Sequence, residues 1–173
     1  LDWGGIEKNA RIFSFWKMLV KFRKSHPVLR PEREMRLMDY IACGYPDLSY
    51  HGQSAWRPQL EGNCRHIGIM FCGKYAKAAH IQADDFLYLA MNMHWESHAM
   101  ALPRLPKGMK WKKVFTTAGH EVKENGADSN MEYVRNVPPR SIVMYISALE
   151  QGTDLEQGTD LEQGTDLEQG AKA

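Results

Sequence analysis

The stretch DFLYLAMNM, residues 85–93, decides the fold that this sequence predicts. It is a short, almost wholly apolar run with aromatic residues, and turn-forming residues bound it, which is typical of a β-strand. Three further stretches are also rich in β-branched and aromatic residues and bounded by turn residues: RHIGIMFCG (65–73), KWKKVFTT (110–117) and RSIVMYIS (140–147). Short strands separated by turn signals indicate an antiparallel sandwich or barrel. We therefore predict a mainly β fold, with an antiparallel β-sandwich domain over residues 32–148.

One amphipathic helix is expected before this domain, in IEKNARIFSFWKMLVKFRKS (6–25). The helix should end at His26-Pro27, because the residue before a proline is pushed out of the helical region. A basic amphipathic helix can bind a calmodulin-type partner or a membrane surface, but packing against a core is the favoured interpretation. The apolar stripe follows the i, i+3, i+4, i+7 pattern at Ile12, Phe15, Trp16, Leu19 and Phe22.

The last segment, residues 149–173, repeats LEQGTD and differs in kind from the rest of the chain. A period of six turns successive leucines by roughly 240° on a helix, so they build no continuous stripe. The period also matches none of the solenoid repeats that bury a core. We expect a solvated, flexible tail without an assigned function.

Composition narrows the function classes. The formal charge is +1 and 43% of residues are hydrophobic, so we expect a globular domain that binds neither nucleic acid nor an anionic membrane. No apolar run reaches the roughly 20 residues of a membrane span. Cys43, Cys64 and Cys72 are odd in number and form no CxxC motif, so reduced thiols in a cytoplasmic protein are the simplest interpretation.

The strongest candidate for a metal site is the alternating triplet His94, Glu96 and His98. On an extended strand these side chains would project from one face with ligand types that suit a transition metal. However, one strand is complete before the triplet, and another begins at residue 99. The triplet should therefore occupy the polar bend of a hairpin, and we expect no metal there.

Hydrolase chemistry has similarly weak support. Asp47, Ser49 and His51 lie close together in GYPDLSYHGQSAW (44–56), but no GxSxG elbow is present, and turn or capping hydrogen bonds are the favoured role. The adjacent Asp84 and Asp85 precede a strand and should point to opposite sides. No glycine-rich phosphate loop is present, so we expect no cofactor.

Aromatic side chains give the one binding hypothesis that the residues allow unaided. Trp56, Trp95 and Trp111 could stack on sugar rings if they are exposed, although burial in the sandwich is the favoured alternative. A stand-alone carbohydrate-binding sandwich is the corresponding function.

Three stretches, taken in order, resemble the C-terminal part of bacterial glycogen debranching enzymes of the isoamylase and pullulanase type, in the α-amylase superfamily. They are LDWGGIEKNARIFSFWKMLVKFRKSHPVLR (1–30), GYPDLSYHGQSAW (44–56) and YLAMNMHWESHAMALPRLPKGMKWKKVFTT (88–117). The first looks like the final barrel loop and last barrel helix, the second like the Pro-Asp-x-x-x-His-Gly phrase after the barrel. The third looks like the Asn-x-x-Trp-Glu, Leu-Pro and Trp-to-Thr succession. The match covers residues 1 to about 148.

The resemblance implies a parent enzyme that hydrolyses α-1,6 branch linkages of glycogen or amylopectin on a (β/α)₈ barrel. Its catalytic carboxylates would lie before Leu1, so none is carried over, and the chain alone should be inactive. Residues 1–31 would be the last loop and helix of the barrel, which would be the partner of the sandwich. Asp2 and Trp3 match a loop near the active-site face, and with Trp95 and Trp111 they are the candidate contacts to a branched α-glucan.

Overall fold

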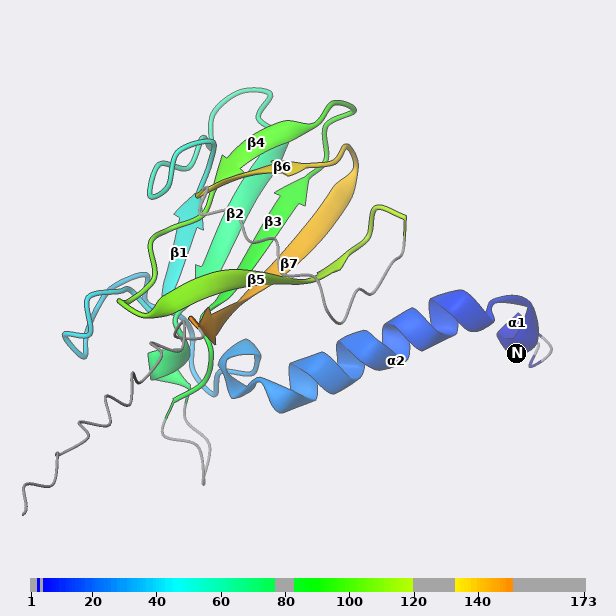
Figure 1. Ribbon diagram of the computed structural model, residues 1–173, viewed down its shortest axis with the longest axis horizontal. Coiled ribbons are helices and arrows are strands. Elements are labelled where there is room, and N and C mark those ends of the chain that lie inside the picture. The colour runs from blue at the N-terminus through cyan, green and yellow to red at the C-terminus, as the bar shows by residue number, and fades with distance from the viewer. Residues whose placement is uncertain (1–2, 4, 77–82, 120–132, 151–173) are drawn as a thin grey trace, which may run out of the picture.

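A computed structural model describes residues 3, 5–76, 83–119 and 133–150. The described chain is mainly β, with helices before the first strand (Figure 1). The helices are α1 (Gly5–Lys8), α2 (Ala10–Ser25) and the 3-10 turns η1 (Pro27–Leu29) and η2 (Gly73–Tyr75). The strands are β1 (Leu48–His51), β2 (His66–Phe71), β3 (Leu87–Asn92), β4 (His98–Ala101), β5 (Met109–Thr116), β6 (Val134–Val137) and β7 (Ser141–Leu149).

The strands form two antiparallel sheets, as expected for a sandwich-like fold. The larger sheet has the order β1-β2-β3-β7-β5, and β4 pairs with β6 in the smaller one. Figure 1 shows the β4-β6 pair crossing in front of the larger sheet. All four strands predicted from stretches rich in β-branched and aromatic residues are present, whereas β1 and β6 were not anticipated. Both are only four residues long, and their Ser49, His51, Arg135 and Asn136 hide the apolar pattern of a strand.

The central strand β3 is apolar on both sides because both faces of the larger sheet are covered. Tyr88 and Ala90 belong to a core that also contains Met100 of β4 and Val137 of β6, between the two sheets. Leu87 belongs to a second core on the other face, which α2 helps to cover. Strand geometry explains the division, because successive side chains point to opposite faces.

Only one side of α2 takes part in this second core. Phe15 and Phe22 contact the Phe115 ring edge-on, with centroids 5.9 and 6.1 Å apart, and Met18 and Leu19 pack beside them. The helix ends at His26-Pro27 as predicted. There the Nδ1–H of His26 donates to Asp84 at 2.8 Å, and the second carboxylate oxygen of Asp84 accepts the Val28 N–H at 3.0 Å. These bonds fasten the end of α2 to the segment before β3.

Tyr88 connects the two sheets. Its side chain is fully buried, and its hydroxyl donates to the Ala101 carbonyl of β4 at 3.1 Å. The ring crosses directly over Gly68 of β2, where a Cβ atom would collide with the Tyr88 hydroxyl and lie 3.2 Å from Cβ of His51. Glycine at position 68 therefore makes room for the tyrosine that connects the sheets.

Asn92, at the end of β3, organises the connection that follows. Its Nδ2 donates to the carbonyls of Glu96, Val137 and Pro138 at 2.8 to 3.0 Å, and its Oδ1 accepts the His94 N–H at 3.0 Å. The connection is not the expected hairpin, because β3 pairs with β2 and β7 while β4 pairs with β6. Residues 93–97 instead cross from one sheet to the other, and the buried amide supplies the donors that a ladder would otherwise supply.

We predict that Asn92→Ala lowers the free energy of unfolding by about 3 kcal/mol, because it removes the hydrogen bonds that the buried amide donates to three carbonyls and the one that it accepts from the His94 N–H. Urea denaturation of the variant would measure the loss. Asn136→Ala is the matched control: Asn136 lies exposed on β6, and its replacement should cost under about 0.5 kcal/mol. Equal losses for the two variants would contradict this role of Asn92.

Candidate functional site

The most prominent surface feature is a second apolar face on α2, which nothing in the described structure covers. We call it the outer face, and it consists of Ile12, Phe13, Trp16 and Val20, all exposed, with Trp16 at 61%. At about 100° per residue these four lie on one arc, next to the arc of Phe15, Leu19 and Phe22 that packs on the sheet. The stripe expected as a single face is therefore divided, since Ile12 and Trp16 belong to the outer face.

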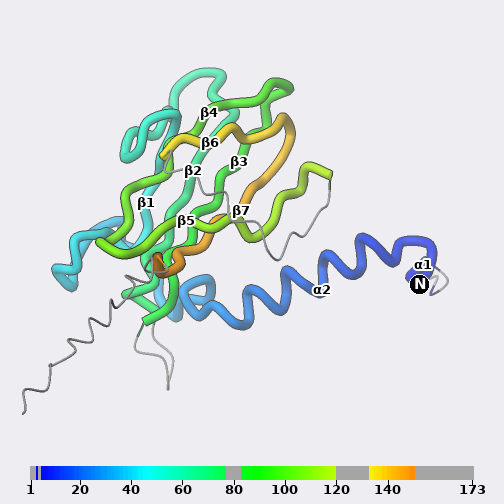
Figure 2. The backbone as a smooth tube through the Cα atoms, in the orientation of Figure 1, coloured from blue at the N-terminus to red at the C-terminus, as the bar shows by residue number. Residues whose placement is uncertain are grey.

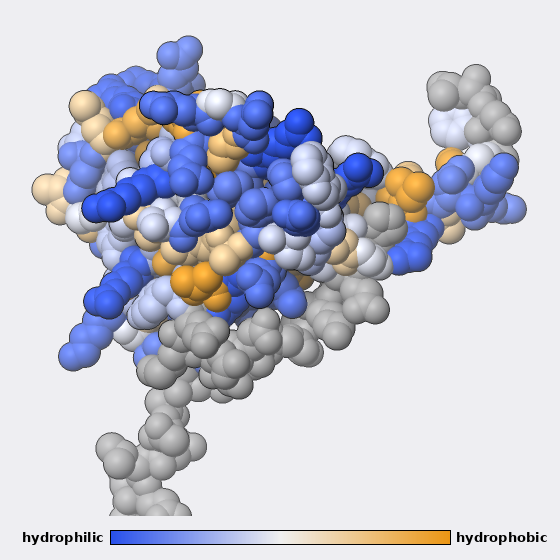
Figure 3. Space-filling view, turned by 90° about the horizontal axis from the view of Figure 1, so that it is seen from above, coloured by the Kyte–Doolittle hydropathy of each residue, from blue (hydrophilic) through white to orange (hydrophobic). Residues whose placement is uncertain are grey.

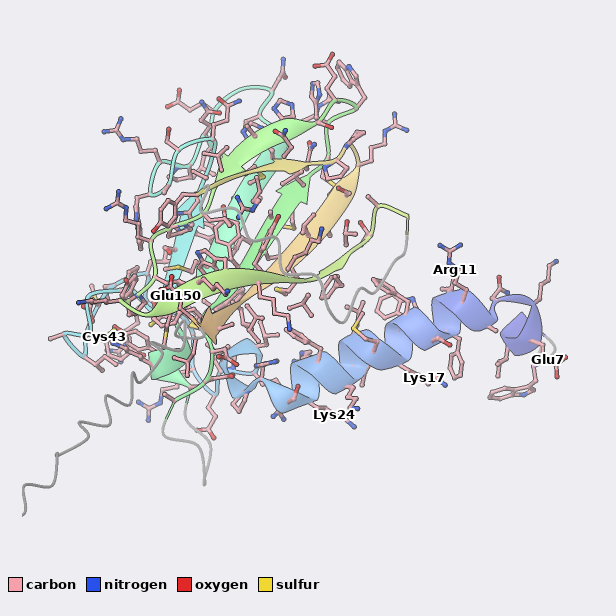
Figure 4. All side chains as sticks on the ribbon, in the orientation of Figure 1. Glu7, Arg11, Lys17, Lys24, Cys43 and Glu150 are labelled. Atoms are coloured by element: carbon pink, nitrogen blue, oxygen red, sulfur yellow. The ribbon has the colours of Figure 1, made fainter. Side chains whose placement is uncertain are left out.

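The helix that carries the outer face also projects from the sheets and is rich in basic side chains. Figure 2 places the N-terminal end of α2 well away from both sheets, and Figure 3 shows hydrophobic residues between hydrophilic ones on the projecting helix. Residues 5–25 contain six basic side chains and one acidic one. Figure 4 shows Lys17 and Lys24 pointing away from the sheets, and the Lys17 ammonium lies 4.7 Å from the centre of the Phe13 ring. An apolar surface with acidic groups at its edge would complement this face.

The structure separates the residues expected to contact glucan. Asp2 lies outside the described residues, and Trp3 is 72% exposed on the projecting end. Trp95 is 59% exposed on the β3-β4 connection, stacked on His94 with ring centroids 4.0 Å apart. Trp111 is half-buried against the inter-sheet core, and its indole N–H donates to the Pro103 carbonyl at 2.7 Å. Trp95 is therefore more accessible to a ligand than Trp111, and Trp56, the third tryptophan of the sandwich, is 45% exposed.

A cluster of histidines lies beside Trp95 and was not expected. The His66 and His98 rings stack at 4.6 Å, and the His94 ring meets His98 edge-on at 4.8 Å. Burial lowers the pKa of His66, and the neighbouring His98 and His94 lower it further. His66 begins β2 and is far from the others in sequence, so only the strand register reveals the cluster. Residues 58–61 and 63–66, with His94 and His98, line an open pocket there.

The ligand atoms of His94, Glu96 and His98 do not all lie within 4.8 Å of one another. Among the described residues, the one group whose ligand atoms all lie within 4.8 Å of one another is His26, Asp84 and Asp85. Those atoms already bind protein groups: Asp84 accepts from His26 and Val28, and Asp85 accepts the Ser147 hydroxyl at 3.1 Å. This cluster joins α2 to the sandwich and needs no ion for that role.

Ser49 and His51 do meet, although sequence spacing argued against it. Both are buried on β1, with Ser49 Oγ 2.8 Å from His51 Nε2. However, His51 Nδ1 accepts the Trp56 N–H at 2.8 Å, so the proton of the neutral ring is on Nε2 and donates to Ser49. The imidazole is therefore not a base toward the hydroxyl. Asp47 binds the backbone N–H groups of Arg36 and Leu48 instead, as expected for a turn residue.

Comparison with known protein families finds no family whose model matches the chain, and comparison with curated proteins finds no match. Within the described residues, no helix is both long enough and apolar enough to span a bilayer.

His51 gives stability a specific pH dependence. Burial lowers its pKa to about 4, so below the unfolded-state value of about 6.5 the unfolded chain takes up a proton that the folded chain does not. Stability from this group is therefore complete above about pH 6.5 and is lost as the pH falls toward 4. Between pH 7 and 5, His51→Gln should lose about 2 kcal/mol less than the unmodified protein in urea denaturation.

Ser49→Ala is the control for this experiment, because it keeps His51 buried and should keep the full pH slope even if overall stability falls. The same slope in His51→Gln as in Ser49→Ala would refute the assignment.

Proposed function

We propose that this chain is a non-catalytic C-terminal region of an α-1,6-glucan debranching glycoside hydrolase that acts in the cytoplasm. In this role the β-sandwich supports a catalytic (β/α)₈ barrel, and α2 is the element that joins them. The observation that carries the proposal is the outer face of α2, a contiguous set of large apolar side chains without a cover in the described structure.

Burial arithmetic supports a partner of this kind. Ile12, Phe13, Trp16 and Val20 are 45 to 61% exposed, so completing their burial would contribute on the order of 1 kcal/mol each. A last barrel helix has two apolar contacts to make, one with the barrel strands and one with the domain that follows. The two arcs of α2 match that requirement, because Phe15 and Phe22 already contact the sandwich.

The order of motifs is the second support. The three stretches that resemble debranching enzymes fall on α1 to η1, on β1 with its flanking turns, and on β3 to β5. Asn92 and Trp111, two residues of the third stretch, hold the inter-sheet connection and the core. These residues serve the architecture of the sandwich, which fits a supporting domain better than a catalytic one. The free thiols of the described structure accord with a cytoplasmic setting.

The test mixes the chain with a separately produced catalytic barrel of a bacterial glycogen debranching enzyme that lacks both its own last barrel helix and its own C-terminal domain. We expect association, measured by sedimentation, and an increase in the debranching of amylopectin. Trp16→Ser should weaken association about 30-fold, because a buried tryptophan at an interface centre contributes about 2 kcal/mol.

Lys21→Ser on the polar side of α2 is the matched control and should change association less than about threefold. Circular dichroism would verify that both variants keep their fold. No association of the unmodified chain, or equal weakening by both variants, would refute the proposal.

An alternative proposal is a carbohydrate-binding module, and the observation that favours it is the exposed Trp95 ring. Arg65 lies 5.3 Å from the centre of this ring, and polar side chains such as Gln59 and Asn63 line the adjacent pocket. An aromatic face bordered by hydrogen-bonding groups is the usual form of a site for a neutral ligand with many hydroxyls.

For the module we predict millimolar or tighter binding of maltooligosaccharides in a calorimetric titration, weakened at least about tenfold by Trp95→Ala. Trp3→Ala, which changes an exposed tryptophan on the projecting end, should leave binding by a sandwich site unaffected. Trp111→Ala should lower stability instead, because it removes core packing and the bond to Pro103. Absence of binding by the unmodified chain would eliminate this alternative.

A further inference from the structure

Two of the three cysteines, 29 positions apart in the sequence, come into contact in the fold. Cys43 lies in the segment before β1, Cys72 follows directly after β2, and their sulfur atoms are 3.9 Å apart. Cys43 is partly exposed, whereas Cys72 is completely buried. A disulfide requires a sulfur–sulfur distance of about 2.05 Å, so closing the bond takes a movement of about 2 Å.

Hydrogen bonds hold the backbone around both cysteines. Asp39 accepts the N–H groups of Cys43 and Gly44 at 3.0 and 2.7 Å, and it also accepts the Tyr75 hydroxyl at 2.6 Å. The N–H of Cys72 donates to the Asp47 carbonyl at 3.1 Å. The two thiols are thus presented to each other by a fixed frame, and side-chain rotation is the principal motion that remains.

From this geometry we propose that Cys43 and Cys72 are an oxidation site, at which a hydroperoxide converts the two thiols to a disulfide. The sulfur of Cys43 attacks the peroxide oxygen, which breaks the O–O bond and gives a sulfenic acid and one water from hydrogen peroxide. The sulfur of Cys72 then attacks the Cys43 sulfur and displaces hydroxide, which leaves as a second water with the Cys72 proton. Two thiols and one peroxide thus give one disulfide and two waters.

The order of the two steps follows from exposure and protonation. Peroxide reaches the partly exposed Cys43, whereas Cys72 is enclosed. Burial also raises the pKa of the Cys72 thiol to about 12, which suppresses the thiolate that a first attack would need. Cys43 is therefore the residue that peroxide oxidises, and Cys72 is the one that resolves the sulfenic acid.

Cys64 is a natural internal control. It precedes β2 and contacts His66, whereas Cys72 follows the other end of the same strand. Eight residues of extended chain separate the two sulfurs by on the order of 25 Å, so Cys64 cannot bond to Cys72. Of the three possible pairings among the cysteines, the structure therefore favours Cys43 with Cys72. This inference does not depend on the function proposed above.

The test treats the full chain with hydrogen peroxide, alkylates the remaining thiols and maps peptides by mass spectrometry without reduction. We expect a linked peptide pair containing Cys43 and Cys72, with Cys64 alkylated, and reversal by dithiothreitol. Dimedone added during oxidation should label Cys43 and not Cys72. Sulfinic acid at Cys43 with Cys72 still alkylatable after unfolding, or a disulfide that includes Cys64, would overturn the proposal.

Thermal unfolding gives an independent measurement. The bond closes a loop of about 30 residues and should raise the melting temperature by roughly 5–10 °C. Cys64→Ser should retain this oxidation-dependent rise, and Cys43→Ser should abolish it. An equal rise in both variants would show that the effect has another origin and would overturn the assignment.

Discussion

The close approach of Tyr88 to Gly68 is the contact on which the sandwich depends. A phenol ring fills the space between the sheets only because the strand beside it has no side chain at that point. The hydroxyl then reaches the Ala101 carbonyl of β4, and the ring packs edge-on against Trp111 at 5.9 Å and against Tyr145 at 6.4 Å. Burial strongly raises the pKa of Tyr88, so it stays a neutral donor at any physiological pH.

The sequence predicted those parts of the fold whose apolar residues follow a clear pattern. The strand at 85–93, its three counterparts and the helix all appear near their expected positions, because their apolar and aromatic residues pack on the cores on either side of the larger sheet. The strands β1 and β6 were missed because each has only four residues and two of them are polar. Two of the carbonyls that Asn92 binds, those of Val137 and Pro138, are also distant from it in the chain. The division of the α2 stripe into two faces likewise depends on where Phe115 lies, which no local pattern contains.

The candidate sites also depend on contacts that the local sequence does not reveal. The alternate spacing of His94, Glu96 and His98 made them the candidate metal site, but the ring that stacks on His98 is His66, from another strand. Spacing also discounted Ser49 and His51, which do form a hydrogen bond. In that pair the decisive fact is the backbone N–H of Trp56 on the far side of the ring, which determines the tautomer. The types of residue indicate which chemistry is possible. Whether it occurs depends here on a further group, the Trp56 N–H, which binds the other nitrogen of the His51 ring.

Tertiary packing stabilises only part of α2, and this affects how the helix forms. Its C-terminal half gains order from Phe15 to Phe22 against the sheet, whereas the N-terminal half has few tertiary contacts beyond the bond from Arg11 to Gly119. A helix of 16 residues is marginal in water without packing. Amide hydrogen exchange should therefore be graded along its length, with fast exchange at the projecting end. Any partner that covers the outer face would complete the folding of this helix, so part of its binding energy would be used in ordering the backbone.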